Sequence, residues 1–100
     1  MTKPCYSDYI RHAIRFYARY PQKRSFKNDV EKAIWGSCHE AIKEYTDRDK
    51  EILLYSYGAF DTLGDNVYFM AKKYNIDQNI IWDMMKEFER KVAIERGLWV

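Results

Sequence analysis

Glycine and proline, the residues that most often interrupt regular structure, are scarce in this chain. The 100 residues include four glycines and two prolines, and Val and Thr are outnumbered by Ile, Ala, Lys, Glu and Tyr. Because strands favour β-branched residues and need turns between them, this composition favours helices over strands. We therefore predict an all-α fold, a compact bundle of about five helices.

The length limits what such a bundle can be. One hundred residues form one small domain, and 47% apolar residues with 17% aromatics are enough to build a core. We expect a single domain, residues 1–100, with a basic helical part (1–45) and a second part (46–100). No apolar run reaches the length of a signal peptide or a membrane helix, so we expect a cytoplasmic protein that does not contact a membrane.

Apolar periodicity and capping residues place the helices. The face formed by Tyr6, Ile10, Ala13, Ile14 and Tyr17 predicts a first helix that Ser7 or Asp8 caps and that ends before Pro21. A second helix follows Asn28-Asp29 and extends to Tyr45, with these residues facing inward: Val30, Ile34, Ser37, Ala41 and Tyr45. Thr46 opens a third helix that stops at Gly58, and Asp65 or Asn66 caps a fourth that ends near Tyr74.

A tight turn is predicted at Tyr74-Asn75-Ile76-Asp77. Asn75 tolerates the left-handed conformation, Ile76 supplies an apolar plug, and Asp77 caps a last helix from Gln78 to about Arg96, with Gly97 as its stop. Small and apolar residues recur where two crossing helices would need them: Met70, Ala71, Ile76, Ile81 and Met84. This pattern predicts a C-terminal helix-turn-helix.

The segments Asp49-Lys50-Glu51-Ile52-Leu53-Leu54 and Met70-Ala71-Lys72-Lys73-Tyr74-Asn75-Ile76-Asp77 resemble region 4 of sigma-70-type factors. The small phage and mobile-element regulators built on that module share the likeness, which covers residues 46–98. The resemblance implies DNA binding, with a recognition helix whose outward residues are Gln78, Asn79, Trp82, Asp83 and Lys86. The amides of Gln78 and Asn79 suit an adenine edge.

The net charge of +2 is unevenly distributed along the chain. Residues 1–27 hold seven basic residues and one acidic residue, whereas residues 28–46 and 47–100 each have a net charge of −2. Arg11, Arg15 and Arg19 recur every four residues and form one stripe about 12 Å long on the first helix. Either the stripe binds phosphates or the acidic surface of a partner protein, or it is the solvated back of an amphipathic helix.

Metal and catalytic sites are not predicted. Cys5, His12, Cys38 and His39 do not have the spacing of a zinc site, and we interpret both cysteines as free thiols. There is no glycine-rich phosphate loop and no nucleophile motif, so we expect neither a cofactor nor an enzyme.

Two functions of different classes remain. The first is a small non-enzymatic DNA-binding transcriptional regulator of a bacterial mobile element. Gln78, Asn79, Trp82 and Lys86 would address the groove, and the arginine stripe would contact phosphates or a second partner. The second is a protein-binding inhibitor module of the phage type, for example an anti-CRISPR, that occupies a nucleic-acid-handling host protein. The acidic last helix and an exposed Trp82 favour the second. A simple homodimer is a further alternative.

Overall fold

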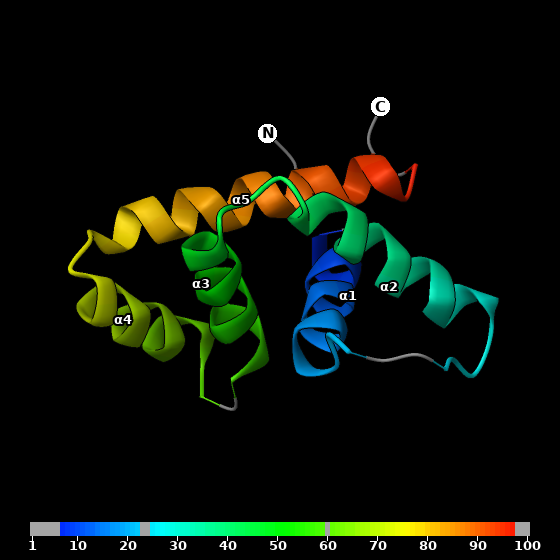
Figure 1. Ribbon diagram of the computed structural model, residues 1–100, viewed down its shortest axis with the longest axis horizontal. Coiled ribbons are helices and arrows are strands. Elements are labelled where there is room, and N and C mark those ends of the chain that lie inside the picture. The colour runs from blue at the N-terminus through cyan, green and yellow to red at the C-terminus, as the bar shows by residue number, and fades with distance from the viewer. Residues whose placement is uncertain (1–6, 23–24, 60, 98–100) are drawn as a thin grey trace.

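The structure is a computed structural model that describes residues 7–22, 25–59 and 61–97, and each regular element in those ranges is an α-helix. The prediction of an all-α fold is confirmed. In chain order the helices are α1 (Ser7–Arg19), α2 (Asp29–Ile42), α3 (Asp47–Gly58), α4 (Leu63–Tyr74) and α5 (Gln78–Glu95) (Figure 1).

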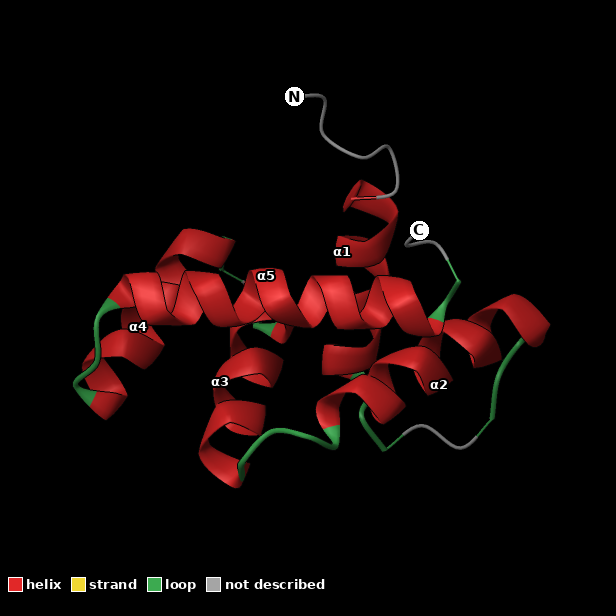
Figure 2. Ribbon diagram, turned by 90° about the horizontal axis from the view of Figure 1, so that it is seen from above, coloured by secondary structure: helices red, strands yellow, loops and turns green. Residues whose placement is uncertain are grey.

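Helix α5 lies across the other four helices (Figures 1 and 2). Its first half lies over α3 and α4, and its second half lies over α1 and α2. Helices α1 and α3 pack closely side by side and so connect the two ends of the molecule. The Cα radius of gyration is 13.3 Å, and about 13 Å is expected for a compact chain of this length. The fold is two helix pairs bridged by one long helix.

Capping side chains begin the helices largely where the sequence predicts. Asn28 accepts a hydrogen bond from the backbone N–H of Glu31, Thr46 from that of Asp49, and Asp77 from that of Asn79. Each satisfies an N–H group that has no partner inside its own helix. The predicted ends of α4 and α5 are also confirmed, because Asn75 is left-handed at φ 54° and Gly97 has φ 72°.

Helices α2 and α4 depart from the prediction. Helix α2 ends at Ile42 instead of Tyr45, and α4 begins at Leu63 because Thr62 caps it, accepting from the N–H of Asp65. The predicted cap Asn66 is instead buried. Its side-chain amide donates toward the carbonyls at the end of α3 and in the following loop: Ser56 at 3.0 Å, Ala59 at 3.3 Å and Asp61 at 3.4 Å. Asn66 therefore ties α4 to the preceding connection.

The predicted inward face of α1 is confirmed, and that of α2 is only partly confirmed. Among the expected residues of α1 Ile10, Ala13, Ile14 and Tyr17 are buried, whereas Tyr6 lies outside the described residues. In α2 Val30 is 59% exposed, and the buried residues are Cys38, Ala41 and Ile42. These three lie in the last two turns, so the core covers only the C-terminal half of α2.

Gly58 ends α3 for a reason that the sequence does not show. Its φ is not positive, and a Cβ added there would lie 3.1 Å from the carbonyl carbon, the oxygen and the Cβ of Ala18 on α1. A Cβ at this point would be crowded, because the α3 backbone approaches α1 closely. By contrast, a Cβ at Gly36 in α2 would meet no atom within 4 Å.

We expect Gly58→Ala to lower the free energy of unfolding by about 1 kcal/mol. The helix gains about 1 kcal/mol from alanine, but crowding a packed contact costs typically 1–3 kcal/mol. The matched control Gly36→Ala should raise the free energy of unfolding by about 0.5–1 kcal/mol, since that Cβ meets open space. Urea unfolding followed by circular dichroism measures both values, and equal stabilisation by the two variants would contradict the close approach.

Candidate nucleic-acid interface

Helices α4 and α5 are joined by a turn of three residues, 75–77. The N–H of Ile76 donates to the carbonyl of Ala71 at 3.0 Å, which folds the chain back against the end of α4. The inward residues of this helix pair are as expected: Met70, Ala71 and Ile81 are buried, and Ile76 and Met84 are partly buried against the core. The connection at residues 75–77 therefore determines which side of the first helical turn of α5 faces solvent.

The residues assigned to the outer face of α5 mostly reach solvent. Gln78, Asn79, Asp83 and Lys86 are exposed. Trp82 differs from the expectation, because its ring is partly buried and packs against the core. The spacing is correct, but the large indole folds back over the neighbouring apolar side chains.

A hollow of about 500 Å³ lies where the end of α4 meets the start of α5. Gln78 and Asn79 contribute to its wall from α5, and Tyr68 and Lys72 contribute from α4. The Lys72 ammonium lies 5.1 Å from the centre of the Tyr68 ring, an arrangement that follows from their i, i+4 spacing. The sequence analysis did not single out this pair, although the spacing was available.

Two of the acidic residues of α5 have basic partners within the molecule. Glu89 has a side chain only 17% exposed, and its Oε2 accepts from Arg11 Nε at 3.3 Å. Glu87 lies 3.3 Å from Lys91 in the same helix. Counting charges along the sequence therefore overstates the negative charge that α5 presents to a binding partner.

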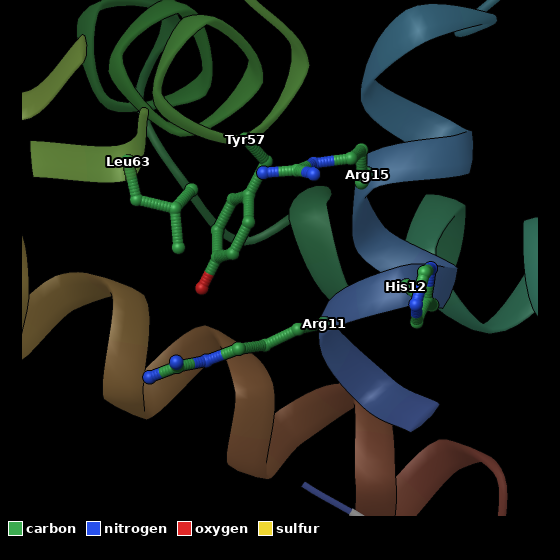
Figure 3. A pocket seen from close by; sticks show the side chains of 5 residues that line it. All are labelled: Arg11, His12, Arg15, Tyr57 and Leu63. Atoms are coloured by element: carbon green, nitrogen blue, oxygen red, sulfur yellow. The ribbon is translucent and has the colours of Figure 1, made fainter. Parts of the chain in front are cut away.

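The arginines of the α1 stripe lie close to neighbouring helices, and Arg11 and Arg19 remain exposed to solvent. Arg11 binds Glu89 on α5, and Arg19 Nε donates to the carbonyl of Gly58 at 3.3 Å. Arg15 is partly buried and extends beside the ring of Tyr57 (Figure 3). The three arginines lie along one side of α1, at the border of its contacts with α3 and α5.

Tyr57 is a buried polar residue beside the arginine stripe, and the sequence analysis did not identify it. Its buried hydroxyl donates to Glu89 Oε2 at 2.6 Å, and the carbonyl oxygen of Met85 lies 3.3 Å away. Burial, and then the Glu89 carboxylate, raise the pKa of this phenol far above its ordinary value, so it remains a protonated donor. Because Glu89 is 32 residues away in sequence, no local pattern reveals the pair.

The residues weighed as metal ligands have other environments. Cys38 is a buried free thiol whose pKa is raised by burial to about 12. His39 Nδ1 lies 3.0 Å from the hydroxyl of Tyr17, and its ring stacks on Trp35 with centroids 4.5 Å apart. Cys5 lies outside the described residues. Within the described part of the chain no group of three or more His, Cys, Asp or Glu side chains is placed to hold a metal ion.

Comparison with known proteins gives no relative. No protein-family model, no curated protein and no solved structure matches this chain. Among the helices of residues 7–22, 25–59 and 61–97, none has the length and apolar character needed to cross a membrane.

We expect Tyr57→Phe to lower the free energy of unfolding by about 2 kcal/mol, because a buried hydrogen bond to a charged group contributes about 1.5–3 kcal/mol. The matched control is Tyr55→Phe on the same helix, whose hydroxyl makes no hydrogen bond within the described residues. It should change stability by less than about 0.5 kcal/mol. Urea unfolding measures both, and equal losses would show that the Tyr57 hydroxyl contributes nothing special.

Proposed function

We propose that this protein is a small non-enzymatic regulator that binds duplex DNA by placing the first turns of α5 in the major groove. The observation that carries the proposal is the exposed amide pair Gln78–Asn79, held at the start of α5 by the turn after α4. An Asn or Gln amide can make two hydrogen bonds to an adenine edge in the major groove. Helix N-termini are the usual point of entry in helix-turn-helix proteins.

The charge around this face supports the proposal. Lys72 lies at the end of α4 and Lys86 lies two turns along α5, and both side chains are exposed. Opposing them are Asp77, the N-cap of α5, and Asp83. Two other acidic residues of α5 have partners, since Glu89 is bound to Arg11 and Tyr57 and Glu87 is close to Lys91. Exposed lysines beside a recognition helix are positioned to neutralise phosphates.

The resemblance of residues 46–98 to sigma-70 region 4 supports the same reading. In that family the module reads promoter DNA, so the corresponding role here is transcriptional regulation within a phage or another bacterial mobile element. The proposal needs no cofactor. Of the α1 stripe it includes Arg15 as a phosphate contact, because Arg15 has no hydrogen bond or ion pair within the described residues. Arg11 and Arg19 make contacts inside the molecule, with Glu89 and with the carbonyl of Gly58.

The test is selection of bound duplexes from a random DNA library, followed by titration at several salt concentrations. We expect Gln78→Ala/Asn79→Ala to reduce the preference for selected over random duplex by about tenfold or more, since each good bidentate pair discriminates by about 1–3 kcal/mol. The salt dependence should remain.

Lys86→Gln should lower the slope of log affinity against log salt by about one, because one phosphate contact is lost. The matched control is Lys32→Gln, an exposed lysine on α2, and it should leave preference and slope unchanged. Binding that is absent, or that does not depend on salt, would overturn the proposal.

A second function, an inhibitor module that binds a nucleic-acid-handling protein, is favoured by apolar side chains around the same helices. Tyr68, Phe69 and Ile80 are each about half exposed, at 50%, 53% and 50%. Aromatic residues of this kind anchor protein interfaces. The homodimer alternative would use the same exposed side chains.

If the second function holds, the unaltered protein should bind a host protein and should not shift duplex DNA. We expect Trp82→Ala and Tyr68→Ala each to lose that host protein. The matched control is Val30→Ala, which truncates an exposed apolar residue on α2 and should retain the partner. Sedimentation of the purified chain identifies the homodimer. Retention of the partner by both aromatic variants would contradict this assignment of the surface.

A further inference from the structure

A pocket of about 320 Å³ lies between α1, α3 and the start of α4, away from the hollow at the turn (Figure 3). Its lining residues are Arg11, His12, Arg15, Tyr57 and Leu63. The volume is at the lower end of the range for small-ligand sites. The side chains of Arg11 and Arg15 extend from α1 on either side of the Tyr57 ring, toward Leu63.

The pocket has more positive than negative charge. Arg11 is bound to Glu89, but Arg15 has no hydrogen bond or ion pair to any residue of the described segments. Leu63 supplies an apolar wall, and the Tyr57 hydroxyl, which donates its one proton to Glu89, lies beside the pocket. Among the described residues, two guanidinium groups therefore face a single carboxylate, and Arg15 has no counter-ion there beside a solvent-accessible space.

The contacts of Glu89 indicate that the residues of this pocket bind an anionic oxygen. One carboxylate oxygen, Oε2, is bound by both the Arg11 guanidinium and the Tyr57 hydroxyl. The chain thus places an anionic oxygen against the donors of the pocket. Arginine forks bind carboxylate and phosphate oxygens with matched geometry, and a phosphate has more oxygens to distribute between two guanidinium groups.

We propose that this pocket binds a phosphate group, held by Arg15 and by Arg11, and that Glu89 competes with the phosphate for Arg11. Binding exchanges the Glu89 carboxylate on Arg11 for a phosphate oxygen, and no covalent bond changes. The phosphate belongs either to a small molecule or to the DNA backbone. Only the second source rests on the proposed function, because the pocket is separate from Gln78 and Asn79.

The test is an NMR titration of the ¹⁵N-labelled protein with inorganic phosphate, with sodium chloride adjusted to hold the ionic strength constant. We expect the largest shifts at residues 11–15 and around Tyr57. Arg15→Gln should weaken phosphate binding by about tenfold or more, because charge-assisted hydrogen bonds are lost. Lys32→Gln, which removes a charge from α2, should leave phosphate binding unchanged.

Glu89→Gln separates this proposal from a purely structural role of the cluster. Removing the competing charge should tighten phosphate binding, whereas loss of a structural contact alone would weaken it or leave it unchanged. Equal phosphate affinity in the unaltered protein and in Arg15→Gln would overturn the proposal, as would weaker or unchanged phosphate binding by Glu89→Gln. Thermal unfolding of each variant establishes that the compared proteins are folded.

A short duplex added to the phosphate-bound protein identifies the source. If duplex displaces phosphate from residues 11–15 and Arg15→Gln weakens duplex binding, the pocket takes a backbone phosphate. If duplex leaves those signals in place, the ligand is a small phosphorylated molecule. Failure of the proposed function would appear as absent duplex binding with intact phosphate binding, so the two results are distinguishable.

Discussion

The hydrogen bond from Tyr57 to Glu89 is the contact on which much of this structure depends. It joins α3 to α5 through a phenol that is 1% exposed, and Arg11 of α1 binds the same carboxylate oxygen. Three helices therefore meet at one polar cluster at the edge of a largely apolar core. Such a cluster requires satisfied partners, because an unpaired buried charge is costly. It also fixes where α5 lies over α1 and α3.

Because of that cluster, the charge distribution along the sequence does not match the charge exposed on the folded surface. The sequence separates a basic N-terminal quarter from a slightly acidic remainder, and this separation first indicates two different binding surfaces. In the folded chain part of each surface faces the other, because Arg11 meets Glu89 and Arg19 meets the end of α3. What remains for a ligand is smaller and more local: Arg15 beside a pocket, and exposed lysines near the turn between α4 and α5.

The two proposed sites lie at different ends of the same framework. The amides at the start of α5 depend on the turn at residues 75–77, whereas the pocket depends on the packing of α1 against α3. Helix α5 contacts both regions and carries Glu89 in its second half. A phosphate that replaces Glu89 on Arg11 would alter a contact of the same helix that carries Gln78 and Asn79. Helix α5 thus carries the amide pair of one proposed site and the carboxylate that contacts the lining of the other.

The sequence by itself determined the helical class, most of the caps and the tight turn, because these depend on interactions within a few residues. Asn28, Thr46 and Asp77 cap the helices that follow them, and Asn75 adopts the left-handed conformation, as predicted. The positions of Gln78, Asn79 and Lys86 on an exposed face also follow from helical periodicity.

Only the tertiary structure decided the rest. It buried Asn66, left Val30 exposed, folded Trp82 against the core and placed Arg11 on Glu89. It also brought the backbone of Gly58 close to Ala18. These outcomes depend on which helices pack together, and Tyr57 and Glu89 meet only when residues far apart in sequence do so. Local periodicity has no information about such distant partners, because their contact is fixed by the packing of the whole core.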